Sequence, residues 1–206
     1  MEGSLNNKSI NLDITHKCTL ECPRCPRKLY DKVPGHDMSI SEYRKIISYF
    51  NHINFCGNIS DPVLNPNFIE FLRINYDFGI PCNVHNAATG KKLTWYKEAF
   101  ITNPKAKWFF GLDGLPNESH KYRVNQKGYQ LFEAMKLSSI MNINSTWRMI
   151  VFKFNEDHIE QCRKLANDIG INFQLVKSSR FKKNDPLKPT KFYIERDYEK
   201  SIPKVS

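Results

Sequence analysis

Three cysteines lie close together near the start of the chain. Cys18, Cys22 and Cys25 form a CxxxCxxC pattern in the segment THKCTLECPRC. Three thiolates on one loop can ligate three irons of a cubane cluster and leave the fourth iron without a protein ligand. An open metal position is typical of a catalytic site, whereas a closed one is typical of a structural site. The spacing therefore predicts a 4Fe-4S cluster with one corner available to a small molecule.

A zinc site is the alternative for these cysteines. Their thiolates and a histidine such as His16 or His36 would make a closed tetrahedral site. Zinc sites usually combine one CxxC with a second, distant pair. The sequence has no second pair, because Cys56, Cys82 and Cys162 stand alone. The iron cluster is therefore favoured, and a non-catalytic zinc-binding or RNA-binding module is the competing class of function.

The composition favours one globular domain in a reducing compartment. The chain has 206 residues, of which 40% are hydrophobic, and this length is short for an eight-unit α/β barrel. The first ten residues lack the apolar core of a secretion signal. No apolar run is long enough to span a bilayer. We therefore expect a cytoplasmic protein with no membrane partner.

The charge is strongly basic. Lys and Arg number 31 against 21 Asp and Glu, which gives a formal net charge of +10. Such an excess favours a polyanionic partner such as RNA, or an acidic cofactor or peptide. A well-solvated lysine-rich surface has the same composition, so the charge alone leaves both interpretations open.

Short apolar runs alternate with longer amphipathic stretches, which indicates repeated βα units around a parallel sheet. We predict strands at residues 10–14, 53–56, 81–85, 107–112, 146–152 and 173–176. We predict one helix that begins at Ser39 or Ser41 and runs to Phe50, and others at 68–76, 93–100, 129–141 and 157–169. The run at 107–112 is almost continuously apolar, as in a strand buried on both faces.

Six βα units form an α/β fold that is a partial barrel, with the loops after the strands gathered on one open face. Residues 1–180 form this predicted core domain. The segment 181–206 is basic and contains Pro186, Pro189 and Pro203. Such a composition favours an extended tail or a covering segment over a second domain.

A CxxxCxxC motif directly after the first strand resembles that of the radical S-adenosylmethionine (SAM) superfamily, and the resemblance covers residues 8–180. Later segments are similar to other motifs of that family, in the same order: FCGNISDP, HNAATG and FGLDGL. The resemblance implies a partial (βα)6 TIM-like barrel, a 4Fe-4S cluster and SAM bound at its open iron. It also implies reductive cleavage of SAM to a 5′-deoxyadenosyl radical, which abstracts hydrogen from a substrate.

The segment FCGNISDP resembles the family's Gly-Gly-Glu-Pro motif, which binds the SAM amino group. Carbonyl groups near Gly57 and Asn58, and the carboxylate of Asp61 before Pro62, could all accept hydrogen bonds from an ammonium group. Asp61 stands where the family usually has Glu, and Asn58 replaces a Gly. A proline-terminated turn with a side-chain bond at Asn58 fits the same residues.

Further cofactor contacts are implied at five positions. Asn86 and Asp113 lie in the second and third motifs, where either residue could instead stabilise its own turn. Arg123 is a candidate partner for the SAM carboxylate, because its planar guanidinium can form two parallel hydrogen bonds. Asn155 is a candidate contact for the ribose. Arg24 precedes the third cysteine, where the family usually has an aromatic residue near adenine, and a guanidinium can also stack on a ring.

The downstream sequence is similar to members that carry a SPASM domain, although no auxiliary cluster is expected because Cys162 is the last cysteine. This resemblance implies a radical SAM oxidoreductase or transferase that acts on a peptide or protein. The basic charge favours a nucleoside or tRNA as the alternative substrate. An external electron donor such as flavodoxin or ferredoxin is expected.

Overall fold

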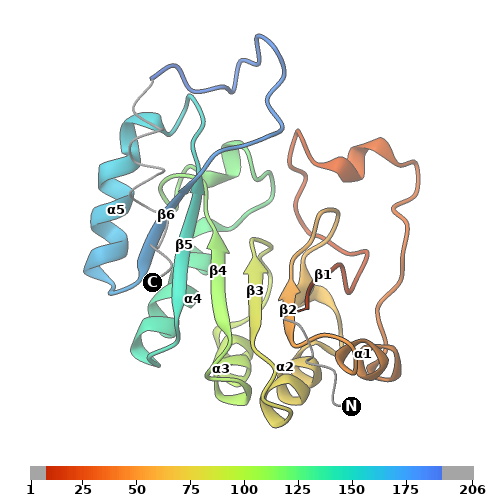
Figure 1. The fold of residues 1–206 in the computed structure, drawn as a ribbon. Coiled ribbons are helices and arrows are strands. Elements are labelled where there is room, and N and C mark those ends of the chain that lie inside the picture. Colours follow the sequence, from red (N-terminus) through yellow and green to blue (C-terminus); the bar gives the residue numbers. More distant parts are fainter. Residues whose placement is uncertain (1–7, 192–206) are drawn as a thin grey trace.

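The structure, a computed structural model, describes residues 8–191. Six parallel strands form one sheet in the order β1-β2-β3-β4-β5-β6 (Figure 1). The strands are β1 (Ser9–Leu12), β2 (His52–Phe55), β3 (Cys82–Asn86), β4 (Lys107–Gly111), β5 (Ser145–Ile150) and β6 (Asn172–Val176). Each predicted strand is present, within two residues at either end, which confirms the α/β partial-barrel prediction.

Five α-helices alternate with these strands. They are α1 (Ile40–Ile47), α2 (Phe68–Asp77), α3 (Leu93–Thr102), α4 (Gly128–Ile140) and α5 (Ile159–Asp168). Short 3-10 turns occur at Pro26–Leu29, Pro62–Leu64, Ser119–Lys121 and Glu156–His158. In the described part of the chain, no helix combines the length and apolar character needed to cross a bilayer.

Local signals explain where the helices begin and end. Ser39 is the N-cap of α1, and its hydroxyl accepts from the Glu42 amide while the Glu42 carboxylate accepts from the Ser39 amide, as in a capping box. The helix then ends at Ile47, three residues before the predicted end. Gly79 and Gly170, just after α2 and α5, adopt positive φ values of 65° and 73°. Glycine is favoured in this left-handed conformation because it has no Cβ.

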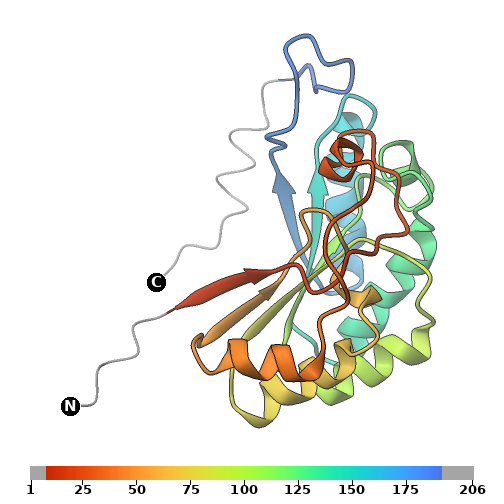
Figure 2. The same ribbon diagram turned by 90° about the vertical axis from the view of Figure 1, so that its right-hand side faces the viewer.

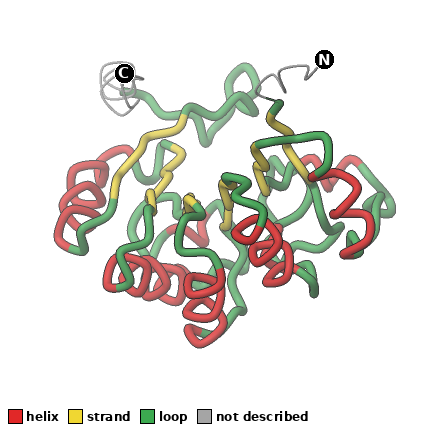
Figure 3. Tube along the Cα trace, turned by 60° about the horizontal axis from the view of Figure 1, so that its bottom comes forward, coloured by secondary structure: helices red, strands yellow, loops and turns green. Residues whose placement is uncertain are grey.

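The helices cover one face of the sheet and leave the other open. Figure 2 shows α3, α4 and α5 on the same side of the strands, and Figure 3 shows the strands as an open arc with helices outside it. Trp108, Phe110 and Trp147 are fully buried between sheet and helices. Since these aromatic residues occupy alternate strand positions, their neighbours in sequence point to the inner face.

The prediction that strand 107–112 is buried on both faces is wrong. Its burial alternates, with Trp108 and Phe110 buried but Phe109 and Gly111 only partly covered. In the described residues no pairing joins β6 back to β1, so the barrel does not close. Inner-face residues therefore border a cavity instead of filling a core.

Candidate active site

A cavity of about 510 Å³ lies on the inner face, at the carboxyl ends of the strands. It is lined by the cysteine loop, the loops after β2, β3 and β4, the ends of β5 and β6, and residues 177–180. Eight of the sequence-predicted site residues line it: Cys18, Cys22, Cys25, Gly57, Asn58, Asp61, Asn86 and Arg123. This volume is in the range of sites that bind cofactors and small molecules.

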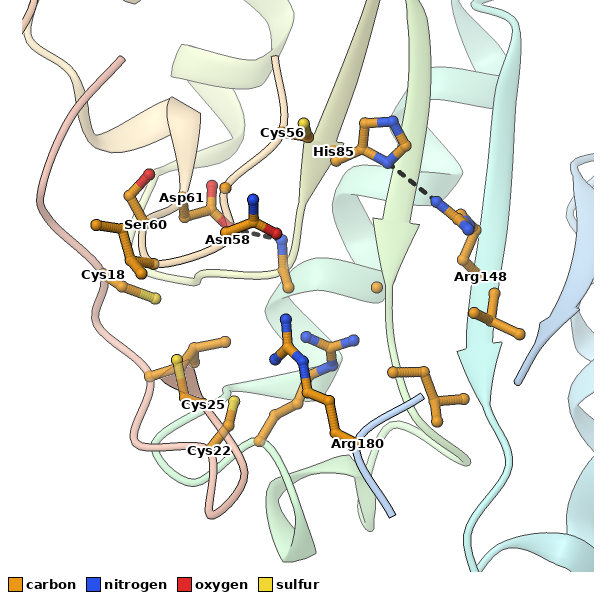
Figure 4. Close-up of a pocket in the computed structure, with 18 of the residues that line it drawn as sticks. Cys18, Cys22, Cys25, Cys56, Asn58, Ser60, Asp61, His85, Arg148 and Arg180 are labelled. Atoms are coloured by element: carbon orange, nitrogen blue, oxygen red, sulfur yellow. Dashed lines mark hydrogen bonds between the residues drawn. The ribbon is translucent and has the colours of Figure 1, made fainter. Parts of the chain in front are cut away.

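The cysteine loop presents its three thiols to this cavity. The Cys25 amide donates to the Cys22 carbonyl at 3.1 Å, which makes a tight turn between the second and third cysteines. Cys22 is buried beside Tyr122 and Phe152, and Leu20 belongs to the same apolar cluster. Figure 4 shows the three sulfur atoms on the same side of the cavity. The loop therefore holds three soft donors at one cavity wall.

The three thiols are compatible with a cluster. Across residues 8–191, no three side chains of His, Cys, Asp or Glu are close enough to share one ion. His36, a proposed zinc ligand, is exposed and instead pairs with Glu42 at 2.9 Å. A cubane offers each thiolate a different iron, so the sulfur atoms need not converge on one point.

The thiols of Cys18 and Cys22 are protonated near neutral pH. Burial raises the pKa of Cys18 to about 12 and also raises the pKa of Cys22. Because the thiolate is the form that binds metal, loading the site releases protons.

Asp61 is buried, and its carboxylate accepts hydrogen bonds from backbone and side-chain amides. One carboxylate oxygen accepts from the Ala87 and Ala88 amides, each at 2.7 Å. The Asn86 amide donates to Asp61 at 3.2 Å and also to the Ala88 carbonyl. Asp61 and Asn86 therefore join the loops that follow β2 and β3. Their roles as SAM contacts stay predictions.

Replacing Asp61 with alanine is expected to destabilise the protein by about 2 kcal/mol, because buried backbone amides lose their acceptor. Chemical unfolding of the variant checks this value. Asp77→Ala, an exposed change at the end of α2, serves as the control and should cost little. Equal stability of the two variants would contradict the role assigned to Asp61.

The rest of the FCGNISDP segment is held by a residue that the sequence analysis missed. The Asp13 carboxylate accepts from the Asn58 amide at 3.1 Å and from the Ser60 hydroxyl at 2.7 Å. A Cβ at Gly57 would lie 1.8 Å from the Ser60 carbonyl oxygen, so this turn requires glycine. Pro62 does not line the cavity and starts a 3-10 turn. Asp13 lies near the end of the first predicted strand, and this position could have identified it as a residue of the site.

Asp113 and Arg123 form a buried ion pair with Nε and Oδ2 2.7 Å apart. The second Asp113 oxygen accepts from the Ile150 amide at 2.8 Å and so connects the ends of β4 and β5. Arg123 lines the cavity, whereas Asp113 lies behind it. The two predicted residues therefore act together, with Asp113 orienting the guanidinium that reaches the site.

Two other predicted contacts lie outside the cavity lining. Asn155 is fully buried. Its side-chain oxygen accepts from the backbone amide of Phe152, and its side-chain nitrogen donates to the backbone carbonyl of Ile150. This turn explains why β5 ends at Ile150 instead of 152. Arg24 donates from Nε to Asp185 at 3.0 Å and does not line the cavity. Both cofactor roles stay predictions.

The Arg24–Asp185 pair fastens the segment after β6 over the cysteine loop. Asp185 belongs to the predicted tail 181–206, of which 192–206 lie outside the described residues. Phe181 packs edge-on against Phe152, and the Lys153 amide donates to the Leu187 carbonyl at 3.0 Å. Part of the segment 181–191 therefore contacts the cysteine loop, through Asp185, and the turn after β5.

Asp185→Asn is expected to lower the melting temperature at neutral pH. Hydrogen bonds from Arg24 and from the Leu187 amide hold the pKa of Asp185 at about 2, below the value of about 3.9 in an unfolded chain. A carboxyl whose pKa is lower in the folded protein than in the unfolded chain stabilises the fold at pH values above its unfolded pKa. This stabilisation is lost as the pH falls through the pKa of the folded protein. The difference in melting temperature between wild type and variant should therefore shrink from pH 5 toward pH 2. A constant difference would contradict this assignment.

The cavity also contains residues that the sequence analysis did not single out. His85, Phe109 and Arg148 come from β3, β4 and β5, and Arg180 follows β6. The Arg148 Nη1 donates to the His85 Nδ1 at 3.1 Å (Figure 4). Alternation along each predicted strand was a usable signal, because these side chains face opposite to the buried aromatic residues.

Comparison with known sequences finds distant relatives. No family model matches the chain. The chain is 20% identical over 169 residues to the PqqA peptide cyclase of Bradyrhizobium diazoefficiens, an alignment that covers 78% of this chain and 43% of that protein. The chain therefore spans less than half the length of this curated relative.

Solved structures share the fold. SuiB of Streptococcus suis bound to S-adenosylmethionine matches with a TM-score of 0.76 and 11% identity, over 93% of this chain and 46% of that chain. The protein anSMEcpe with bound AdoMet matches with a TM-score of 0.63 and 14% identity, over 86% of this chain and 54% of that chain. These proteins and the PqqA peptide cyclase are radical SAM enzymes. In its cysteine motif, in the order of its later motifs and in its fold, the chain resembles the radical SAM superfamily, and its SPASM-associated members in particular.

Proposed function

We propose that the protein is a radical SAM enzyme that modifies a peptide or protein. The observation that carries this proposal is the position of three thiols from one loop on the wall of a 510 Å³ cavity at the carboxyl ends of the strands. A 4Fe-4S cluster and SAM held there would supply radical chemistry that acts on a C–H bond of the substrate. Cys18, Cys22 and Cys25 are the proposed cluster ligands.

Other lining residues fit the polar groups of SAM. Carbonyl groups at Gly57 and Asn58 are acceptors for its ammonium group. The Arg123 guanidinium, oriented by Asp113, is the proposed partner of its carboxylate. Asp61 and Asn86 keep the two loops in place around it. Leu20, Tyr122 and Ile150 add apolar surface to the lining, which limits the access of water to a reactive radical.

A peptide substrate is supported by the relatives. The curated relative is a peptide cyclase, and SuiB and anSMEcpe have also been solved with peptides bound. A nucleoside or tRNA substrate is the alternative, supported by the net charge of +10. The same basic charge would attract an acidic electron donor such as flavodoxin or ferredoxin. Free cysteines at all six positions support a reducing, cytoplasmic location.

The test is anaerobic reconstitution followed by reaction with SAM. Loaded protein should be brown and hold about four irons per chain. After reduction with dithionite it should release 5′-deoxyadenosine and methionine from SAM, measured by liquid chromatography. Colourless protein with one zinc per chain would instead identify a structural metal site and overturn the proposal.

A further inference from the structure

The cavity has a second wall whose chemistry the cofactors do not require. Figure 4 shows Cys18, Cys22 and Cys25 on one side of the cavity and the His85–Arg148 pair on the opposite side. The opposite wall is built from β3, β4 and β5 and from the segment after β6. A substrate that meets a radical formed near the cysteines has to lie between the two walls.

This wall carries an excess of positive charge. Among the described residues, the cavity lining contains five cationic side chains but only one carboxylate, that of Asp61. Two of the five lie outside the second wall, in the segment after the cysteines and in the loop after β4. Arg27 donates to the His16 and Ile59 carbonyls, at 2.8 and 2.9 Å, and Arg123 pairs with Asp113. The other three lie on the second wall: Arg148, Lys177 and Arg180.

Bound SAM would not neutralise these cations. SAM brings a sulfonium and an ammonium group beside its single carboxylate, so it adds no net negative charge. The cluster thiolates belong to the first wall. A cavity of one charge sign raises the local concentration of an oppositely charged ligand, and its charged groups are most effective where water is excluded.

Arg148 lies beside two stacked rings. The His85 and Phe109 rings stack with centroids 4.7 Å apart and an interplanar angle of 9°. The Arg148 guanidinium lies over the Phe109 ring at 5.6 Å and donates to His85 Nδ1. Burial and the adjacent Arg148 lower the pKa of His85 to about 4, so the ring is neutral near pH 7 and the pair keeps the charge of the guanidinium.

We propose that Arg148, supported by His85 and Phe109 and assisted by Arg180 at the cavity mouth, binds a carboxylate of the peptide substrate. A planar guanidinium matches a carboxylate in shape and charge. The Phe109 ring adds apolar surface to the same wall. Figure 4 shows the Arg180 guanidinium turned into the cavity. This inference rests on the proposed function, because it takes the cavity as the substrate site.

The test measures peptide affinity on cluster-loaded, unreduced full-length protein with saturating SAM, by fluorescence anisotropy at low ionic strength. The probes are fluorescein-labelled Gly-Gly-Glu-Gly-Gly amide and its Gln counterpart. A charged hydrogen bond favours the Glu peptide by about tenfold. Arg148→Gln should reduce this preference to about twofold or less. Arg44→Gln, an exposed change on α1, should leave it intact.

A third probe distinguishes the two sources of a carboxylate. If the Gln peptide with a free C-terminal carboxylate gains the same affinity, the site binds a peptide terminus, and otherwise it binds an acidic side chain. Either result supports the proposal. Arg180→Gln, at an exposed position that leaves the core untouched, should reduce the preference about threefold, and it provides a second test if Arg148→Gln does not fold.

Three results would overturn the inference: equal affinity for Glu and Gln peptides in the wild type, an unchanged preference in both variants, or a preference that disappears when SAM is added. If adenosine monophosphate binds more tightly than the Glu peptide, and this binding depends on Arg148, the wall binds a phosphate and the inference is wrong. Failure of the proposed function gives a different result. Wild-type protein that selects the Glu peptide but releases no 5′-deoxyadenosine would remove the radical chemistry and leave the carboxylate site standing.

Discussion

Cys22→Ala is expected to abolish both cluster assembly and the formation of 5′-deoxyadenosine. Cys22 is the middle ligand of the proposed set and is buried next to Tyr122 and Phe152. Loss of its thiolate leaves two protein ligands for a cubane that needs three. Iron content, the visible absorbance of the cluster and the yield of 5′-deoxyadenosine are measured on anaerobically reconstituted protein. All three should fall to the level of a mock reconstitution.

Cys56→Ala is the matched control for this experiment. Cys56 lines the same cavity but follows β2 and is not part of the cysteine loop. The control should keep about four irons per chain and full activity. Loss of iron from Cys56→Ala would indicate a fourth protein thiolate and a closed cluster, which would contradict an open corner for SAM. Cys22→Ser keeps the size of the side chain and separates loss of the ligand from loss of packing.

The cysteine loop and the strands were predictable because their signals are local. The spacing of the three cysteines is contained in one short segment, and strand positions follow from apolar alternation around residues such as Trp108 and Phe110. A strand signal also fixes which end of the strand faces the open side of a parallel barrel. The prediction that Asn58 and Asp61 lie at this end needed no knowledge of distant contacts.

Other features depend on contacts between distant parts of the chain. Arg24 and Asp185 are separated by 161 positions, and no pattern near either residue indicates that they pair. The apolar run around Phe109 suggested burial on both faces, because its composition does not reveal that the sheet stays open. The Arg148–His85 contact joins β5 to β3 across β4, and it follows only from the register of the strands.

Asp113→Asn is expected to lower the free energy of unfolding by about 3 kcal/mol. The Asp113 side chain has no exposed surface, and its partner Arg123 is 16% exposed. Removing the negative charge leaves a guanidinium in a poorly solvated position, where an uncompensated charge is costly. Urea unfolding followed by circular dichroism measures the effect. Asp168→Asn is the control, because its pair with Lys164 lies on the surface of α5 and should contribute less than about 1 kcal/mol.

A double variant separates the ion pair from packing at the same position. Asp113→Asn combined with Arg123→Gln removes both charges, so it should recover much of the stability that the single change loses. A double variant as unstable as Asp113→Asn would show that the hydrogen bond to the Ile150 amide, rather than the ion pair, is the larger contribution. The double variant should regain stability but bind SAM more weakly than the wild type, because it lacks the guanidinium proposed to hold the SAM carboxylate. Stability and SAM affinity should therefore separate in this variant.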